Sequence, residues 1–429
     1  MRDNETLPLG EKLRQVRQAR KMSQKLVAIP ALYTIGQISH IEKGRATCNA
    51  DTLLKIREVL GIEKMPLFEP ERKVFKDKLC AFYDLISEWK LDEAKEMREE
   101  LSDIKYLPFE RELNTYYDLF DCRLLIAEGK FDESAEILKT IEESLQEVDD
   151  EIIYYYYCNM GALNMRRFNE EVAMEFFLKA SKLVKLGYKG YDVLHFNIAR
   201  CLMKLGFLVR SIDLLEKWHE MFSGEESDEH IELLVNSMLA RNYIRLNRLQ
   251  SAKSLLRKCL TKARLMNNRR YMGVVFYDYG FMYKAAGAGN SAIEYLDKAL
   301  ECFEEGETNY MEVLYLKVLC YIDMKYNTLC MQLIEEGKKL AKGSEMYTTL
   351  FESAEHLISL SDHTSTQHIE GVTIPYLLKT FSFYAALVYS EAVREYFEGR
   401  GSGFAKKAMQ MSDVSRSIYA RMMEGGDFE

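Results

Sequence analysis

Apolar residues at the start of the chain recur with the spacing of short amphipathic helices. Leu9, Leu13 and Val16 follow one another at i, i+4 and i+7, so they share one face of a first helix. Ser23 is a favoured N-cap for a second helix, which begins at the next residue and runs to about residue 29. Pro30 cannot continue that helix because it lacks a backbone N–H, so we expect a turn there.

A third helix is predicted after this turn. Thr34 is a suitable N-cap, the helix is expected to run through Ile41, and Gly44 supplies its C-terminal stop. Ile38 and Ile41 are at i and i+3 and should both face the core. The positions left to face outward are Ile35, Gly36, Gln37, His40 and Lys43. A fourth apolar helix is predicted over residues 50–60.

These elements resemble the helix-turn-helix of phage repressors, the Cro/C1 or Xre type, over residues 1–66. The resemblance implies that the third helix enters the major groove of duplex DNA. There Gln37 can read adenine, while His40 and Lys43 can meet bases or phosphates. The full set of expected DNA contacts is Gln24, Thr34, Ile35, Gly36, Gln37, His40 and Lys43. Pro30 and Ala31 replace the usual glycine of the turn, which leaves its geometry open.

From residue 74 onward the chain repeats an apolar helix, a short turn and a second helix. One mark per turn falls at positions 91, 131, 168, 207, 249, 288 and 326, so the steps along the chain are 40, 37, 39, 42, 39 and 38. Such a period predicts a solenoid of helical hairpins, about eight or nine in number. It resembles tetratricopeptide repeats, which implies a right-handed superhelix with a concave groove. We therefore expect an all-α protein: a helix-turn-helix domain over 1–66, a linker over 67–73 and repeats over 74–429.

Small residues mark where the helices of a repeat should approach closely, and they are Gly161, Ala199, Ala240 and Gly280. In tetratricopeptide repeats the residue two positions earlier points into the groove; here these residues are Asn159, Asn197, Met238 and Asp278. Arg200 lies one turn beyond Asn197, and Arg241 is its counterpart in the next repeat.

Asn can clamp a peptide backbone because its amide both donates and accepts, and Arg can pair with a carboxylate. We therefore expect a short peptide to bind Asn159, Asn197, Arg200, Arg241 and Asp278. The alternative is that these side chains are solvated groove residues or form hydrogen bonds between helices.

The charge of the chain is divided unequally. Residues 1–66 hold 12 Lys and Arg against 7 Asp and Glu, a net charge of +5, whereas the remainder holds 46 against 60, a net charge of −14. A basic head on an acidic body predicts that phosphate contacts are confined to the head.

Several classes of site are not expected. The nine Cys are scattered without a C-x-x-C pair and the seven His lack ligand spacing, so we expect buried thiols, no metal and no cofactor. No nucleophile triad, paired carboxylate site or phosphate loop is found, so the chain is not expected to be an enzyme. It has no run of 18 apolar residues and begins with a polar segment, which favours a cytoplasmic protein without a membrane span.

Head and repeats together resemble one family over almost the whole chain: the peptide-pheromone receptors of Gram-positive bacteria called RRNPP. The resemblance implies a homodimeric transcription regulator in quorum sensing. It implies that a re-imported peptide binds the groove, where Asn159 and Asn197 hold its backbone. Such a dimer should bind an inverted-repeat operator in double-stranded DNA.

Two other functions stay open. Some relatives dephosphorylate or sequester a response regulator through a polar residue on a helical surface, and residues 74–110 could form one. No Gln occurs between Gln37 and Gln146, however, which weakens this alternative. The other is a DNA-bound scaffold whose repeats recruit a protein partner and sense no peptide.

The C-terminal segment from Tyr376 to Met423 is rich in Phe, Tyr, Met and Leu. An apolar excess at the end of a solenoid requires either a cap or a partner. We expect a homodimer interface there, with a cap as the alternative.

Overall fold

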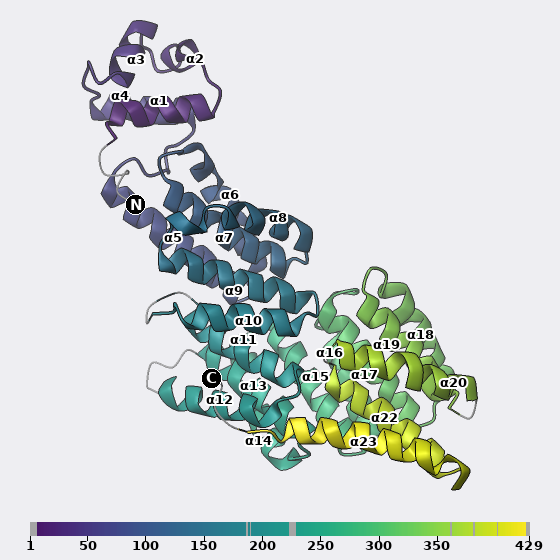
Figure 1. Cartoon of the computed structure of the whole chain (residues 1–429). Helices are drawn as coiled ribbons and strands as arrows, with labels where there is room; N and C mark the ends of the chain where they lie inside the picture. The colour runs from purple at the N-terminus through teal and green to yellow at the C-terminus, as the bar shows by residue number, and fades with distance from the viewer. Residues whose placement is uncertain are drawn as a thin grey trace. The chain divides into compact units, whose positions relative to one another are not determined.

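The structure is a computed structural model, and it describes residues 7–185, 188, 190–222, 229–360, 363–380, 382–400 and 402–425. All regular secondary structure in these residues is helical (Figure 1). Two compact units divide the chain: unit 1 comprises Met1–Arg167 and Glu175–Tyr191, and unit 2 comprises Phe168–Met174 and Asp192–Glu429. None of the helices in the described ranges is long and apolar enough to cross a membrane.

The helix-turn-helix domain of unit 1 consists of α1 (Leu9–Ala19), α2 (Gln24–Ala28), α3 (Ile35–Glu42) and α4 (Ala50–Leu60). Both predicted N-caps are present. The Ser23 side chain accepts a hydrogen bond from the backbone N–H of Leu26, and the Thr34 side chain accepts one from Gln37. The domain buries an apolar core of Leu13, Val16, Val27, Ile38, Ile41, Ile56 and Leu60. The predicted helix boundaries are therefore confirmed to within one residue for α2 and α3.

Leu32 adopts the left-handed backbone conformation in the turn between α2 and α3, with φ of +63°. This conformation favours glycine because a Cβ atom clashes with the backbone. Leu32, rather than Pro30 or Ala31, thus takes the glycine-like position of this turn. Its side chain is 80% exposed, so packing does not compensate for the backbone strain.

Gly10 allows α1 to cross the end of α3 at close range. A Cβ atom at this position would lie 2.0 Å from the backbone oxygen of Ile41. A backbone atom held in a helix cannot move aside as the tip of a flexible side chain can. Nothing in the local sequence predicts this requirement.

The predicted linker over residues 67–73 is wrong, because α5 (Glu69–Ser87) begins inside it. Leu67 is buried, its N–H donates to the Glu71 carboxylate at 2.9 Å, and its carbonyl accepts from Lys12 Nζ at 2.7 Å. Arg57 of α4 pairs with Glu71 at 2.6 Å. Because both polar groups of Leu67 are satisfied, this segment is a buried junction and not a free connection.

The helices from α5 onward follow one another as pairs joined by short turns (Figure 1). Those that continue from α5 are α6 (Leu91–Leu101), η1 (Ser102–Tyr106), α7 (Arg111–Ala127), α8 (Phe131–Glu142), η2 (Leu145–Glu147), α9 (Asp150–Arg166) and α10 (Glu170–Ser181). Unit 2 then contains α11 (Tyr191–Lys204, from its second residue on), α12 (Leu208–Phe222), α13 (Glu229–Arg245), α14 (Leu249–Leu265), α15 (Arg269–Ala285) and α16 (Gly289–Leu300). It ends with α17 (Thr308–Asp323), α18 (Asn327–Leu340), α19 (Glu345–Ile358), α20 (His363–His368), η3 (Ile369–Thr373), α21 (Ile374–Lys379), α22 (Phe383–Glu398), η4 (Ser402–Phe404) and α23 (Ala405–Met422).

A residue with positive φ stands in the turn of each of seven successive pairs. These residues are Trp89, Gly129, Phe168, Gly206, Asn247, Gly287 and Lys325, with φ between 57° and 87°. The steps between them along the chain are 40, 39, 38, 41, 40 and 38, which is the period that the sequence predicts. The repeat is therefore a repeat of backbone geometry as well as of apolar pattern.

The small residues predicted at the helix crossings do lie at close approaches. A Cβ atom on Gly161 would lie 2.5 Å from the ring of Phe177, and one on Gly280 would lie 2.6 Å from Leu296. Ala199 and Ala240 are fully buried. Helix pairing in the repeats thus depends on positions without a large side chain.

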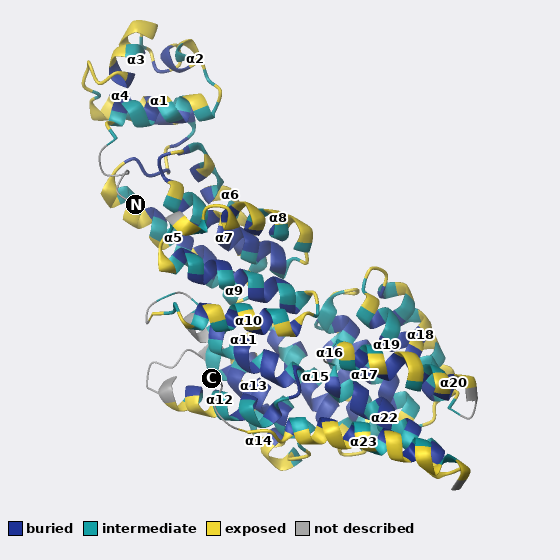
Figure 2. Ribbon diagram, in the orientation of Figure 1, coloured by how far each residue is buried: buried dark blue, intermediate teal, exposed yellow. Residues whose placement is uncertain are grey.

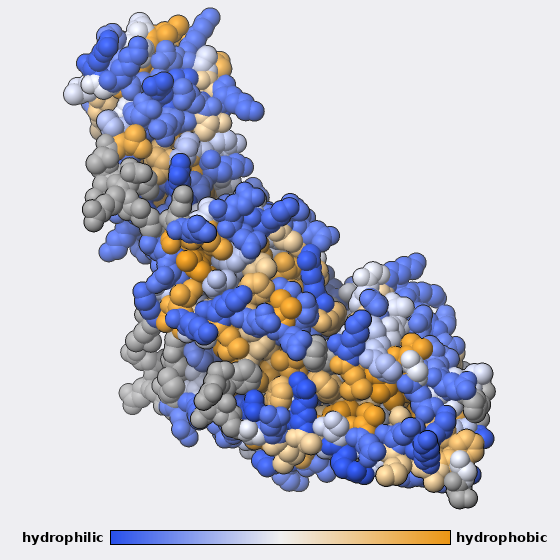
Figure 3. Space-filling view, viewed as in Figure 1, coloured by the Kyte–Doolittle hydropathy of each residue, from blue (hydrophilic) through white to orange (hydrophobic). Residues whose placement is uncertain are grey.

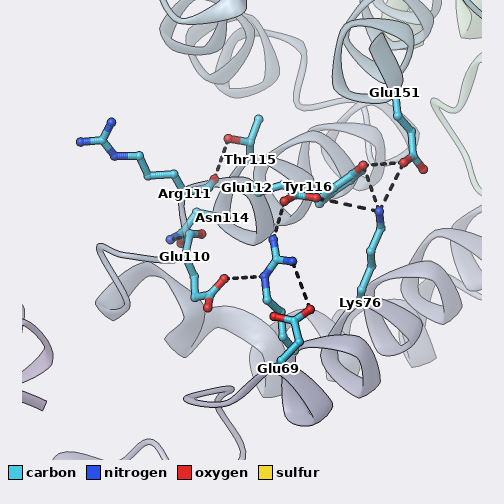
Figure 4. Close-up of polar contacts among 10 residues, drawn as sticks. Glu69, Lys76, Glu110, Arg111, Glu112, Asn114, Thr115, Tyr116 and Glu151 are labelled. Carbon is cyan, nitrogen blue, oxygen red and sulfur yellow. Dashed lines mark hydrogen bonds and ion pairs between the residues drawn. The ribbon is translucent and has the colours of Figure 1, made fainter. Parts of the chain in front are cut away.

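Arg72 and Lys76 of α5 join that helix to the next pairs of unit 1. Figure 4 shows Lys76 beside Tyr116 and Glu151. Arg72 Nε lies 3.0 Å from Glu110, a buried acid, and its Nη2 pairs with Glu112 at the start of α7. Lys76 Nζ lies 3.3 Å from Glu151 of α9. Because each cation bridges successive helices, the array is held together by polar contacts along this side as well as by its apolar core.

The aromatic residues near the C-terminus mostly lie inside unit 2. Tyr389 and Phe397 of α22 are at most 1% exposed, and the Tyr389 hydroxyl lies 2.9 Å from that of Tyr315 in α17. Arg421 of α23 donates to the backbone oxygen of Leu205 at 2.6 Å. This burial is what the alternative of a cap predicts, while α23 keeps an exposed side that includes Met409.

Candidate DNA-binding surface and inner basic cluster

The outward side of α3 carries the side chains that the sequence assigns to DNA. Ile38 and Ile41 are buried at 2% and 6% exposure and fix the helix to the domain core. Exposed and buried positions of α3 are yellow and dark blue in Figure 2. The exposed ones are Thr34 at the N-cap, Ile35, Gly36, Gln37 and His40, followed by Lys43. The structure thus brings six of the seven predicted contacts to one exposed segment.

Gln37 has its side-chain oxygen engaged within the helix. In a capping box with Thr34, Gln37 Oε1 accepts from the Thr34 backbone N–H at 2.8 Å and from the Thr34 hydroxyl at 3.0 Å. Bidentate reading of adenine needs both the oxygen and the nitrogen of the amide. Gln37 would have to release the cap to read adenine in that way, whereas Nε2 can donate to a base acceptor with the cap intact.

Gln24, the seventh predicted contact, is half-buried at the start of α2. Its Nε2 donates to Glu42 at 2.8 Å, and Arg17 pairs with the same carboxylate through two nitrogens at 2.6 and 3.0 Å. Arg17 also donates to the backbone oxygen of Met22 at 2.8 Å. A bidentate, largely buried pair of this kind fixes α1, α2 and α3 in one geometry. Sequence reasoning missed the Arg17–Glu42 pair because its members are 25 residues apart.

The helix-turn-helix domain is attached to the first helix pair by its own basic residues. Arg20 Nη2 lies 2.7 Å from Asp103, and its guanidinium group lies 4.1 Å from the centre of the Tyr106 ring. Lys12 lies over the Phe109 ring at 5.2 Å. Part of the positive charge of the head is therefore used inside unit 1 and is not available to phosphates.

Asn159 lies in unit 1 and is buried at 3% exposure. Its Nδ2 donates to the backbone oxygen of Leu119 in α7 at 2.7 Å. The donor side of this amide therefore joins α9 to α7, as in the alternative expectation of a hydrogen bond between helices.

Asn197, Arg200, Arg241 and Asp278 all lie in unit 2. Asp278, predicted as a direct peptide contact, is 0% exposed, so it cannot touch a ligand in this structure. One of its oxygens accepts from Ser237 at 2.7 Å and the other from Arg241 at 2.5 Å. Burial alone would lower the pKa of Arg241, but Asp278, Tyr277 and Glu312 together outweigh it and raise that pKa above its ordinary value. Asp278 therefore orients Arg241, whose side chain keeps 20% exposure.

Lys204 and Arg245 join this group, although the groove positions in the sequence did not single them out. Each lies one helical turn after a predicted residue, since Lys204 follows Arg200 in α11 and Arg245 follows Arg241 in α13 by four positions. Arg245 lies 5.3 Å from the ring centres of Phe281 and Tyr384. We call Arg200, Lys204, Arg241 and Arg245 the basic cluster. Its signal in the sequence is an i, i+4 pair of cations that recurs at the same place in the next repeat.

Glu312 of α17 is the internal counter-charge of the basic cluster. Its carboxylate lies 3.8 Å from Lys204 Nζ, and the two side chains are 26% and 33% exposed. Burial alone would raise the pKa of Glu312, but Lys204, Arg241 and Arg200 together lower it. For Lys204 burial dominates, and the pKa is lowered despite Glu312. The buried Glu170 is a third acid whose charge interacts with Lys204 and Arg200. Four cations thus face three carboxylates, Asp278, Glu312 and Glu170, and the cluster favours one further anion.

Comparison with known proteins supports both parts of this description. Residues 10–69 match the family model described as a helix-turn-helix domain. The chain is 20% identical over 387 residues to the transcriptional activator NprA of Geobacillus stearothermophilus, covering 86% of this chain and 93% of that protein. It is also 20% identical over 279 residues to the regulatory protein RapD of Bacillus subtilis (strain 168), covering 63% and 78%.

Solved structures with the same fold include a Rap protein complexed with competence and sporulation factor, at a TM-score of 0.67 and 17% identity over 82% of this chain and 97% of that one. NprR in complex with its cognate peptide NprX aligns at a TM-score of 0.62 and 19% identity, over 81% and 99%. The chain resembles the RRNPP regulators.

The expected all-α fold, a helix-turn-helix followed by a superhelix of helical repeats, is thereby confirmed. The helix-turn-helix match also supports DNA binding by the head of this RRNPP-like chain. At identities below one fifth, the solved structures establish the fold alone.

Proposed function

We propose that this chain is a transcription regulator that binds operator DNA through α3 and is controlled by a short peptide bound at the basic cluster. The observation that carries the proposal is the presence of both sites in one chain: an exposed reading surface over a rigid core, and a partly exposed group of cations with one charge to spare. Operator binding requires access to the chromosome, so we expect the chain to act in the cytoplasm.

The peptide is proposed to be short and linear and to carry a carboxylate, either at its C-terminus or on an acidic side chain. Arg200 and Arg241 can pair with that carboxylate, and Asp278 holds Arg241 in place for it. Asn197, buried at 7% exposure on α11, would meet the peptide backbone. We propose no direct role in this site for Asp278, which is fully buried, or for Asn159, which lies in unit 1.

Affinity selection of random heptapeptides on the full-length protein would test the ligand. Recovered peptides should contain a carboxylate, and converting it to an amide should weaken binding. Asn197→Ala should weaken it about 3- to 10-fold, the range of one lost neutral hydrogen bond at about 0.5–1.5 kcal/mol. Arg200→Ala should weaken it more, because a charged partner is left without its counter-ion.

Arg257→Ala is a matched control, because Arg257 is an exposed arginine on α14 outside the basic cluster. Its affinity for the selected peptides should equal that of the wild type. Equal affinity in an Arg200→Ala/Arg241→Ala double variant would show that this cluster is not the ligand site. DNA binding without any selected peptide would favour the scaffold alternative.

For the DNA-binding half, replacing Gln37 and His40 together by Ala should abolish specific footprints. Both side chains are exposed, and the Thr34 hydroxyl still caps α3 when the Gln37 side of the capping box is lost, so the circular dichroism spectrum should remain that of the folded protein. An unchanged footprint would contradict the assignment of α3 as the recognition helix. The salt dependence of binding would separately report the phosphate contacts.

We further propose that the regulator is a homodimer on an inverted-repeat operator. The exposed apolar residues Met409, Tyr419 and Met423 near the C-terminus are the candidate contact, at 65%, 46% and 58% exposure. Peptide binding would alter the distance between the two heads and thereby the fit to both half-sites. Sedimentation of a Met409→Arg/Met423→Arg variant tests the interface, and a dimer that persists would place it elsewhere.

A further inference from the structure

One large apolar side chain lies at the start of the recognition helix without a role in the core. Ile35 is the first residue of α3 and is 49% exposed, whereas Ile38 and Ile41 supply the packing of the same helix. Figure 3 shows hydrophobic atoms, in orange, among mainly hydrophilic ones on the α1–α4 domain. An exposed isoleucine at this place requires an explanation other than stability.

The neighbours of Ile35 leave its side chain open to a base edge. Gly36 has no side chain, and a Cβ atom there would find only the Thr34 hydroxyl within 4 Å, at 3.9 Å. Gln37 holds its oxygen in the capping box with Thr34. The first turn of α3 can therefore approach the floor of a groove with Ile35 as its foremost large side chain.

We propose that Ile35 reads the 5-methyl group of a thymine, so that each operator half-site carries a T opposite the start of α3. This inference rests on the proposed binding of DNA by α3. The methyl group of thymine is the one apolar group that base pairs present in the major groove. A β-branched side chain in a helix has essentially one rotamer, so the Ile35 methyl groups are already positioned and little entropy is lost on contact.

The test uses the full-length protein and operators selected from random duplex DNA. Thymine is then replaced by uracil one position at a time, which removes the methyl group and leaves the hydrogen-bonding edge and the phosphates unchanged. At one position per half-site we expect about three- to fivefold weaker binding, the effect of losing one buried methyl group. The other thymines should tolerate the replacement.

Two variants connect this effect to the residue. In Ile35→Ala the same uracil should cause no further loss, because the contact is already missing. In Leu54→Ala the uracil effect should persist in full, since Leu54 is also exposed, at 60%, but lies on α4. Selection with Ile35→Gln should move the preference at this position from thymine to adenine, which glutamine reads through two hydrogen bonds.

A uracil scan that leaves wild-type affinity unchanged at every position would overturn the inference while the function stands. So would a uracil effect of equal size in Ile35→Ala. Failure to recover any bound duplex would instead overturn the proposed function and this inference with it.

Discussion

The recognition helix and the basic cluster present their functional side chains in opposite states. On α3 the residues assigned to DNA are exposed on a helix whose other side is fixed in an apolar core. In unit 2 two cations of the basic cluster are already paired with carboxylates of the protein itself, Arg241 with Asp278 at 2.5 Å and Lys204 with Glu312 at 3.8 Å. The surface of α3 is exposed before DNA binds, whereas a carboxylate that binds the cluster competes with Glu312 for Lys204.

The difference follows from how far each site is exposed to water. An exposed surface can keep polar groups hydrated until DNA arrives, and its affinity then comes from many phosphate contacts. Cations on a half-buried surface lose hydration, so counter-charges of the protein itself must stabilise them in the free state. A ligand that replaces such a counter-charge changes internal contacts, which is what a switch requires.

The largest effect is expected from removing the buried acid of the cluster. Asp278→Ala leaves Arg241 and Ser237 without their shared partner and should lower the stability of α13 and α15 by about 3 kcal/mol, as for a broken buried ion pair. Hydrogen exchange of backbone amides in these helices would measure the loss, while the amides of α1–α4 should be unaffected.

Two companion variants show whether charge is the cause. Asp323→Ala removes a comparable acid that is 59% exposed and pairs with Lys284, so it should cost less than about 1 kcal/mol. The double variant Asp278→Ala/Arg241→Met should recover most of the lost stability. If it does not, the cost of Asp278→Ala comes from the cavity and not from the unpaired charge.

In the α1–α4 domain the largest loss of stability is expected from a substitution that changes no charge. Gly10→Ala places a methyl group 2.0 Å from the Ile41 backbone oxygen, and we expect a loss of about 1–3 kcal/mol in the α1–α4 domain, typical of overpacking. Specific DNA binding should fall with it. Hydrogen exchange over residues 9–60 checks the prediction.

Gly36→Ala is the matched control, since a Cβ atom there meets only the Thr34 hydroxyl, at an ordinary contact distance of 3.9 Å. It should stabilise α3 by about 0.5–1 kcal/mol because alanine restricts the unfolded chain. Equal destabilisation by both substitutions would mean that α1 does not contact α3 at Gly10 as described.

How far the sequence predicts each region also differs. The caps at Ser23 and Thr34 and the period of the repeats are local patterns, and local patterns determined most of the fold correctly. The linker over residues 67–73 was predicted wrongly because the contacts of Leu67 include one with Lys12, 55 residues earlier. Gly10 gives no local signal either, since its requirement comes from the backbone of another helix.

For the candidate sites, the sequence predicts well which side chains are exposed and poorly which side chains are paired with one another. Ile35 and His40 follow from helical spacing alone. The role of Asp278 could not be predicted, because groove position suggests exposure while the partners that bury it, Ser237 and Arg241, lie on a helix of the preceding repeat. Lys204 could have been predicted from the sequence, since it follows Arg200 at i+4.

A smaller effect is expected from the counter-charge Glu312. Glu312→Gln removes a carboxylate that competes with the ligand for Lys204, so a carboxylate-bearing peptide should bind more tightly by about 1 kcal/mol, the upper end for a partly exposed pair. The same peptide with its carboxylate converted to an amide should bind the variant and the wild type equally. Calorimetry with both peptides checks this, and tighter binding of both would show that the gain does not come from two carboxylates competing for Lys204.

The smallest effect concerns backbone strain, where the two regions should behave alike. Leu32 in the head and Lys325 in unit 2 are exposed and have φ of +63° and +60°. A left-handed residue other than glycine costs about 1–2 kcal/mol, and glycine returns about 0.5–1 kcal/mol of that through its freer unfolded chain. Leu32→Gly and Lys325→Gly should therefore each stabilise their own turn by roughly 0.5 kcal/mol, measured by hydrogen exchange in the adjoining helices.

The control is Ala31→Gly, at a buried position without positive φ, which should destabilise the head instead. The strain depends on the dihedral angles of one residue and not on neighbouring charges, so both turns should gain stability. If only one turn does, contacts around the other turn already compensate its backbone strain.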